Sequence, residues 1–327
     1  RLDVADVVPA FDSLSGEIHA ASRGALLQNR FLHDGIDRHL DGAAMAGQIA
    51  PGVRAWVAGS SSQRRTDASA QNTGLRSSQH GLMAGAGWMF GDALELGVAA
   101  GQQQLVSRLA QRDARAETDS TEYGVYGQYR WQGLSLRAGV SRADYRTDST
   151  RTAQVGSTLS EGLAAREDAT GTTAFLRAGW TFGGPRLQLT PELELAQVRL
   201  RSDGAQEHGG HSALQLDGQT ARYRTGLAAL RADWDISGGQ RDRAALTARV
   251  GWQLAGGDRL PQATARFVEG TQDFGIAAAP LARRSALAQL GVAVSPTDNS
   301  RLSLQMQGQR GDGQRDVGAQ LDLSVAF

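Results

Sequence analysis

Ser15 and His19 are the residues of this chain whose types and spacing come closest to catalytic chemistry. A helix would place them one turn apart, as a serine nucleophile and its general base require. No Gly-x-Ser-x-Gly elbow accompanies them, and no acidic residue can be assigned as a third member. We therefore expect both side chains to make a helix surface polar, and we predict no catalytic residue.

Two further motifs carry residue types that bind ligands. His208-Gly-Gly-His211 offers two imidazoles on a flexible segment, which is too few for a protein zinc site. Arg310-Gly-Asp312 is a tripeptide that can engage integrins, but Gly and Asp are also favoured by β-turns. We interpret the first motif as an exposed loop and the second as a turn. The chain has no cysteine, phosphate loop or dinucleotide fingerprint, so we predict no metal and no cofactor.

The composition of the 327-residue chain argues against a helical membrane protein. Hydrophobic residues make up 40% of it, and the mean hydropathy is −0.35. No run of about 18 apolar residues is present to form a transmembrane helix. A membrane β-barrel remains compatible, because alternation halves the apparent hydrophobicity of each strand. The 34 basic and 34 acidic residues balance, so we expect no nucleic-acid partner.

The last strand has one apolar face and one polar face. The apolar parity holds Val317, Ala319, Leu321, Leu323, Val325 and Phe327. The intervening residues are small or polar, as a strand between lipid and a wet interior requires. The ends of soluble domains usually fray into solvent, so an apolar strand that ends on Phe327 favours the closing strand of an outer-membrane barrel.

A helical pattern precedes the strands. Apolar residues recur at spacings of three and four over 12–41, and Asp12 and Ser13 are candidate N-cap residues. Glycines and Pro51 follow and end the pattern. We therefore divide the chain into a linker over 1–11, a helix over 12–41 and a barrel over 52–327.

After Pro51 the hydrophobic period changes to two, which predicts twelve antiparallel strands. They span 53–62, 78–90, 93–104, 118–131, 133–146, 169–182, 186–199, 219–235, 243–255, 284–295, 299–309 and 314–327. We place residues 260–268 in a loop, although they alternate as well. Short turns alternate with long polar connections, the latter over 63–77, 105–117, 147–168, 200–218 and 256–283. This asymmetry is typical of outer-membrane barrels, whose short turns face the periplasm.

Aromatic residues collect where even-numbered strands meet the short turns. They are Trp88, Phe90, Tyr129, Trp131, Trp180, Phe182, Trp234 and Phe327. Such a girdle is expected at a membrane interface, where amphipathic rings sit at headgroup level.

The polar parity of the strands predicts the wall of a hydrated lumen. We expect this wall to include Glu95, Arg130, Arg137, Arg177, Glu192, Glu194 and Arg249. A helix about 10–12 Å wide fits inside a barrel of this size, so we expect the helix to lie in the pore. Its first residues in the pore would be Leu14, Ser15, Gly16, Glu17, Ile18 and His19. An even number of strands returns both barrel ends to the periplasm, so a helix through the lumen would put the N-terminus outside the cell.

The segment Phe11-Asp-Ser-Leu-Ser-Gly-Glu-Ile-His-Ala20, followed by Ala25-Leu-Leu and Phe31-Leu, resembles the opening of the autotransporter β-domain. The likeness is greatest to the β-domains that follow subtilisin-like serine protease passengers. The strand Gly81-Leu-Met-Ala-Gly-Ala-Gly-Trp88 and the final Phe327 are similar as well. The resemblance covers the chain from residue 11 onward.

The resemblance implies a twelve-stranded barrel with a pore-traversing helix that acts in type V secretion. It also implies that barrel-assembly machinery recognises the last strand through Leu323, Val325 and above all Phe327. Some members of the family cleave themselves at paired asparagines in the helix. Here Asn29 is followed by Arg30, so we do not expect that cleavage.

We expect a monomeric translocator domain in the bacterial outer membrane that exports or anchors an N-terminal passenger and is not itself an enzyme. The passenger would lie upstream of Arg1 and could be a serine protease. The expected partners are outer-membrane lipid, the chain's own passenger, periplasmic chaperones and barrel-assembly machinery. The alternatives are an outer-membrane barrel hydrolase, a simple porin and a soluble β-sandwich. A hydrolase would need a catalytic set that we cannot assemble, and a porin would lack the leading helix.

Overall fold

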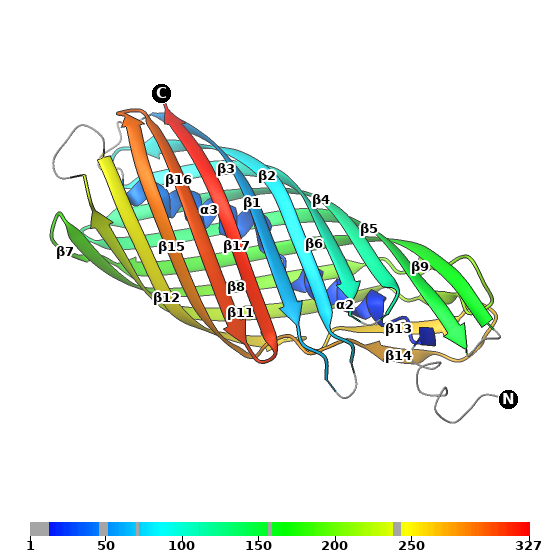
Figure 1. Cartoon of the computed structure of the whole chain (residues 1–327). Coiled ribbons are helices and arrows are strands. Elements are labelled where there is room, and N and C mark those ends of the chain that lie inside the picture. Colours follow the sequence, from blue (N-terminus) through cyan, green and yellow to red (C-terminus); the bar gives the residue numbers. More distant parts are fainter. Residues whose placement is uncertain (1–12, 46–51, 70–71, 111, 156–158, 238–242) are drawn as a thin grey trace.

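Twelve long strands form a closed antiparallel barrel around a helical segment (Figure 1). The computed structural model describes residues 13–45, 52–69, 72–110, 112–155, 159–237 and 243–327. The first and last strands pair with each other, so the barrel closes on itself. The fold class predicted from the alternation is confirmed.

The barrel strands are β1 (Val53–Thr66), β2 (Leu75–Phe90), β3 (Leu94–Leu109), β4 (Ala114–Trp131), β5 (Leu134–Val155), β6 (Leu159–Trp180), β8 (Leu187–Ser202), β11 (Gln219–Asp235), β12 (Arg243–Gly257), β15 (Arg284–Thr297), β16 (Ser300–Gly311) and β17 (Gln314–Ala326). A two-residue strand, β7 (Phe182–Gly183), extends the hairpin between β6 and β8.

The alternation sorts side chains between the outer wall and the lumen. On β8, Leu193 and Leu195 point outward and are each 66% exposed, whereas Glu192 and Glu194 are buried inside. Apolar side chains outside and polar side chains inside are the pattern of a barrel that faces lipid. The aromatic residues near the short turns are also exposed on the outer wall, as Trp131 (54%), Trp180 (50%) and Trp234 (55%) illustrate.

The two ends of the barrel differ, and we name them by their connections. The turn end carries the tight turns such as Gln132-Gly133 and Asp298-Asn299, and the loop end carries the extended hairpins. β5 and β6 have 22 residues each, so most of the expected loop 147–168 is strand. That expectation was wrong because outward-facing residues are no longer apolar beyond about Val140. The hydrogen-bonded pairing of β5 and β6 nevertheless continues above the apolar wall, where both faces of the strands are polar.

A small second sheet covers the loop end. It contains β9 (Ala205–Gln206), β10 (Leu214–Leu216), β13 (Gln262–Phe267) and β14 (Phe274–Ala277). The expectation that 260–268 is a loop was therefore wrong, and the expected loops 200–218 and 256–283 each contain strands. The apolar parity of β13 is real, but Ala263 and Ala265 face the helix in the lumen and not lipid.

The helical segment lies inside the barrel, as expected, but it is broken in two. α2 (Glu17–Leu27) and α3 (Phe31–Met45) are separated at residues 28–30, and Ser13 and Leu14 before α2 are helical as well. Gly16 precedes α2 with a φ of 66°, where an added Cβ would lie 2.6 Å from the Leu214 side chain. The Asn29 side chain accepts the backbone N–H of Phe31 and begins α3. The expected linker 1–11, Asp12 and Pro51 lie outside the described residues.

No helix among the described residues has both the length and the hydropathy needed to cross a membrane.

Candidate functional site

The candidate site is the lumen, which the helical segment fills from one end to the other (Figure 1). All eleven residues of α2 are buried at the loop end, and the described core-facing residues of α3 are buried toward the turn end. The helix therefore acts as a plug, and its contacts with the wall decide how firmly it is held.

At the loop end the contacts are apolar. Ile18, Ala20 and Ala21 pack against the small sheet, whose contributing side chains are Leu214, Leu216, Ala263, Ala265 and Ile276. These residues are 6% exposed or less, so removing α2 would uncover the whole cluster. The small sheet and the helix thus stabilise each other.

Beside this cluster, Glu207 joins the helix to the wall. His19 Nε2 lies 2.7 Å from Glu207 Oε1, and Arg151 donates to both carboxylate oxygens at 2.7 Å. Glu207 lies in the connection between β9 and β10, outside the membrane-spanning strands. Burial alone would raise the pKa of Glu207, but hydrogen bonds from His19 and Arg151 outweigh it and lower the pKa to about 2.

Ser15 and His19 have different partners among the described residues. The ring of His19 faces Glu207, and Arg112 donates to Ser15 Oγ at 3.5 Å. The two residues contact different partners, in agreement with a polar helix surface and not with a nucleophile and its base.

The other residues expected at the start of the pore helix are also in contact with the wall. Leu14 packs on a small cluster that contains Leu163. Glu17 pairs with Arg112 at 2.7 Å and accepts the backbone N–H of Thr73 at 2.8 Å.

Polar contacts continue through the middle of the lumen. Arg23 on α2 pairs with Glu167 at 2.5 Å. At the helix break, Asn29 donates to Glu122 at 2.7 Å and to the hydroxyl of Tyr145 at 3.1 Å. These hydrogen bonds attach the non-helical residues to β4 and β5, so the wall of the barrel holds the helix break in place.

The densest group of charges lies between α3 and the turn end. Asp37 contacts Arg137 at 3.1 Å and Arg177 at 2.5 Å. Asp41 contacts Arg137 at 2.6 Å and also pairs with Arg231. We call Asp37, Asp41 and the arginines 137, 177, 231 and 249 the plug cluster.

Wall carboxylates complete the charge balance of the plug cluster. Glu192 pairs with Arg249 at 2.6 Å, and Glu194 pairs with both Arg177 and the helix residue Arg30. Asp233 on β11 pairs with Arg231 at 3.0 Å, so the four arginines of the plug cluster face two helix carboxylates and three wall carboxylates. An ion removed from water needs such compensation, because an isolated buried charge costs several kcal/mol.

The wall residues predicted from the polar parity fall into three groups. Arg137, Arg177, Glu194 and Arg249 contact or approach the helix, and Glu192 acts through the arginines. Glu95 is buried beside Arg54, at 3.5 Å, and makes no ion pair or hydrogen bond with the described side chains of the helix. Arg130 is only half-buried, at the turn end of β4, and makes no ion pair with the described part of the helix.

Several residues of the site were missed from the sequence. They are Arg23, Asp37, Asp41, Glu122, Arg151, Glu167, Glu207 and Arg231. Arg231 lies on the inward-facing side of β11, so the alternation of that strand could have identified it as a lumen residue. Arg151 and Glu167 lie on strand extensions that were assigned to a loop, so their parity was not considered.

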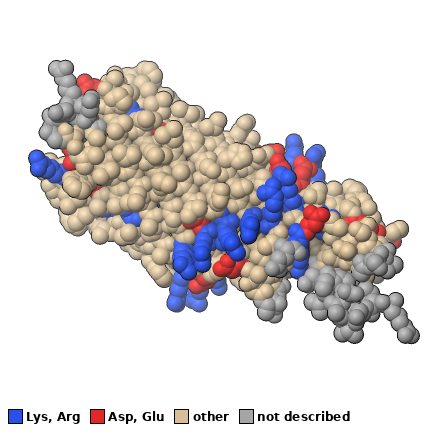
Figure 2. Space-filling model, viewed as in Figure 1, with Lys and Arg blue, Asp and Glu red and all other residues tan. Residues whose placement is uncertain are grey.

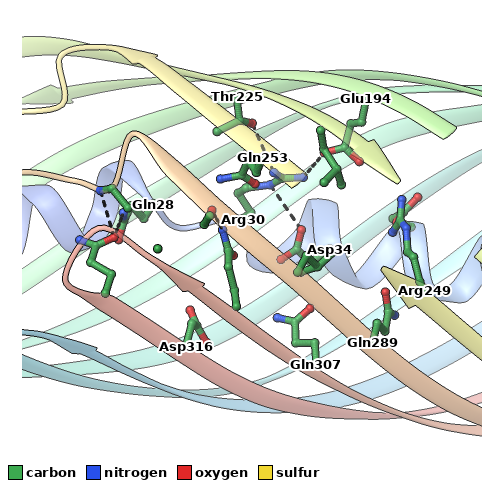
Figure 3. Close-up of a pocket in the computed structure, with 18 of the residues that line it drawn as sticks. Gln28, Arg30, Asp34, Glu194, Thr225, Arg249, Gln253, Gln289, Gln307 and Asp316 are labelled. Atoms are coloured by element: carbon green, nitrogen blue, oxygen red, sulfur yellow. Dashed lines mark hydrogen bonds and ion pairs between the residues drawn. The ribbon is translucent and has the colours of Figure 1, made fainter. Parts of the chain in front are cut away.

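The wall opposite the charged side is rich in glutamine. Figure 3 shows Arg30 at the helix break, Asp34 on α3, and Gln289, Gln307 and Asp316 on the facing strands. A cavity of about 100 Å³ lies between them. It has room for a few water molecules beside the helix.

The two motifs outside the lumen behave as surface features. His211 is paired with Glu269 at 3.1 Å, and the described residues contain no group of three or more residues suited to a metal ion. Asp312 accepts the backbone N–H groups of Arg283 and Arg284, so its carboxylate organises a turn.

A closed barrel with a helix bound in its lumen defines an outer-membrane translocator. The chain belongs to the autotransporter β-domain family, whose model matches residues 55–307. Such a β-barrel lies in the bacterial outer membrane, and the translocator domain is not itself catalytic.

Comparison with individual proteins agrees with this membership. An extracellular serine protease of Serratia marcescens is 28% identical over 321 residues, which cover 96% of this chain and 30% of the relative. The chain thus spans under a third of that relative's length. The fold is similar to the translocator domain of the autotransporter NalP from Neisseria meningitidis, with a TM-score of 0.72, 16% identity and coverage of 95% and 99% of the two chains. The β-domain of the Bordetella autotransporter BrkA is also similar, with a TM-score of 0.61, 14% identity and coverage of 84% and 100%.

The pKa of Glu207 leads to a prediction about stability and pH. The folded-state pKa is about 2 and the ordinary value is 4.5, so the ionised carboxylate stabilises the folded chain. Its contribution, on the order of 3 kcal/mol, is complete above about pH 4.5 and is lost as the pH falls toward 2. We expect Glu207→Gln to lower the melting temperature at pH 7 and to have little effect near pH 2.

The measurement is thermal unfolding in detergent at pH 7, 4 and 2.5, with Glu269→Gln as the exposed control. A melting-temperature difference between wild type and Glu207→Gln that is the same at all three pH values would contradict this account.

Proposed function

We propose that this chain exports the polypeptide fused before it and then anchors that passenger at the cell surface, with residues 13–45 left in the lumen as the plug. The observation that carries the proposal is the course of the helical segment. It starts at the loop end and finishes at the turn end, where β1 begins. A passenger attached to its N-terminal side would therefore emerge at the loop end.

The proposed orientation places the loop end outside the cell. Short turns face the periplasm in outer-membrane barrels and longer connections face outward. The N-terminus would then be extracellular, and the end of β17 would be periplasmic.

The size of the lumen suggests an order of events. The cavity beside the helix has room for water and not for a second chain, so the passenger must cross before the helix docks. Docking then forms the plug cluster and the apolar contacts of α2. Folding of the passenger outside the cell would supply the direction of transport.

The relative named an extracellular serine protease favours a protease as the passenger. This chain corresponds to under a third of that relative, so the proposed proteolytic activity would belong to sequence before Arg1.

Exposure of the two barrel ends on intact cells tests the orientation. We expect a peptide tag fused before Arg1, behind a secretory signal, to bind antibody on intact Gram-negative cells. A tag inserted between Asp298 and Asn299, in the turn between β15 and β16, should bind only after the outer membrane is permeabilised. A tag between Asp312 and Gly313, in the turn between β16 and β17, controls for insertion damage and should be accessible on intact cells. The reverse pattern of the first two tags would overturn the proposed orientation.

We also propose that barrel-assembly machinery recognises β17 through Leu323, Val325 and Phe327, after periplasmic chaperones have carried the unfolded chain. Leu323 and Phe327 are 44% and 79% exposed on the outer wall, so both side chains are available at the strand that closes the barrel. Because barrel closure pairs the described edge strands with each other, the folded protein is proposed to be a monomer.

Assembly in cells and stability after folding separate a recognition role from a packing role. We expect Phe327→Ala to reduce the folded, heat-modifiable fraction in cells severalfold and to leave the melting temperature of purified folded barrel nearly unchanged. Phe182→Ala is the matched control, since Phe182 is another exposed aromatic residue at the turn end. Equal assembly of the two variants would contradict recognition of Phe327.

A further inference from the structure

Six arginines form one continuous row across six neighbouring strands on the outer wall at the loop end. In order along the barrel they are Arg310, Arg315, Arg65, Arg76, Arg108 and Arg115. Each is the direct cross-strand partner of the next, so all six share one face of the sheet. Figure 2 shows Lys and Arg atoms in an oblique band across this wall, and all are arginine because the chain has no lysine. We call these six residues the arginine stripe.

The stripe carries positive charge that the protein itself does not balance. All six residues are exposed. Arg65 lies 3.6 Å from Asp67, and Arg115 pairs with Glu117. The other four members make no ion pair with any described residue.

Some other exposed arginines at the same end of the barrel pair with aspartate, whereas Arg199, Arg222, Arg283 and Arg284 make no ion pair with any described residue. Arg142, Arg146, Arg166 and Arg201 each lie within 4.0 Å of an aspartate. The stripe is therefore distinguished by its continuity across six neighbouring strands, and not by its lack of ion pairs alone.

Like charges in directly opposite positions destabilise a sheet, so the stripe needs an anion from outside the chain. Directly paired Cα atoms lie about 4.5–5.5 Å apart, which lets neighbouring guanidinium groups converge on one phosphate. The planar fork of arginine binds phosphate oxygens in pairs, which a lysine cannot do.

The position of the stripe indicates where that anion lies. On β17, Arg315 and Val317 are consecutive outward-facing residues, and Val317 is 59% exposed as part of the apolar wall. On β3, Gln102 and Gln104 lie between Arg108 and the exposed Val98. Because barrel strands tilt by about 35–45°, a row across the strands climbs away from the membrane. The stripe thus begins at the edge of the apolar wall and rises into the polar zone above it.

We infer that the arginine stripe binds the phosphate groups of a phosphorylated glycolipid in the outer leaflet. Such a lipid has acyl chains for the apolar wall, phosphates at its edge and sugars above, which matches the course of the stripe. The inference rests on the proposed orientation of the loop end, but binding of the lipid can be measured without it.

Native mass spectrometry of the folded barrel in detergent micelles measures this binding. The probe is a bisphosphorylated, acylated glucosamine disaccharide, compared with its dephosphorylated form and with its deacylated headgroup. The stripe variant is Arg65→Gln, Arg76→Gln, Arg108→Gln and Arg315→Gln combined. The control variant is Arg142→Gln, Arg146→Gln, Arg166→Gln and Arg201→Gln combined, which removes the same charge from the same end.

We expect the stripe variant to raise the Kd for the bisphosphorylated probe at least tenfold and the control variant to change it less than twofold. The dephosphorylated probe should bind wild type no better than the stripe variant. An equal rise in Kd in the two variants would overturn the inference. Equal affinity of the wild type for the bisphosphorylated and dephosphorylated probes would overturn it as well. Binding of the deacylated headgroup as tight as that of the whole lipid would show a site for soluble phosphates and overturn the lipid assignment.

Heat-modifiable migration checks that both variants fold. If the stripe variant does not fold, the double variant Arg76→Gln and Arg108→Gln replaces it, with an expected rise in Kd of at least threefold. The tag experiment on cells is independent, so a failure of the orientation and a failure of lipid binding are distinguishable.

Discussion

Buried charge in the lumen is the constraint on which this structure depends. The wall places Arg137, Arg177, Arg231 and Arg249 close together and away from solvent. Three wall carboxylates, Glu192, Glu194 and Asp233, pair with these arginines, and Glu194 is shared with Arg30. The helix supplies further negative charge through Asp37 and Asp41. Breaking one partner of a buried pair costs about 3–5 kcal/mol. The barrel without its helix would therefore have to hydrate these arginines, and the helix without the barrel would lose both its ion pairs and its apolar cover.

Both helices of the plug combine buried apolar contacts with ion pairs to the wall. At the loop end, α2 is held mainly by apolar contact with the small sheet, together with His19 and Glu207. At the turn end, α3 is held by the plug cluster and by apolar contacts of Phe31, Leu32, Ile36 and Leu40 with the wall. The glutamine-rich wall of β15, β16 and β17 contributes a cavity and hydrogen bonds such as that from Arg38 to Gln320.

Much of the fold was predictable because a barrel wall imposes a period of two on the chain. The outward Leu193 and Leu195 and the inward Glu192 and Glu194 follow from that period alone. The strand extensions were not predictable in this way, since residues around Arg151 are polar on both faces. The small sheet was missed because Ala263 and Ala265 face α2, whose position depends on the assembled barrel.

The candidate site was only partly predictable for the same reason. Parity separates lumen from lipid, but it does not say which wall residues meet the helix. Glu95 and Arg137 have the same parity signal, yet only Arg137 contacts Asp37 and Asp41. The helix break was invisible to periodicity because it depends on Asn29, whose partners Glu122 and Tyr145 lie far along the chain.

Single-channel conductance in planar lipid bilayers tests most directly whether buried charge holds the plug. The account predicts that wild type has low, steady conductance, and that Asp37→Asn combined with Asp41→Asn gives frequent large openings approaching those of a barrel lacking residues 13–45. Asp34→Asn, a control at a carboxylate that is 34% exposed, should stay close to wild type. If the double variant conducts like wild type while the barrel lacking residues 13–45 conducts strongly, the plug is held by something other than the charges described here.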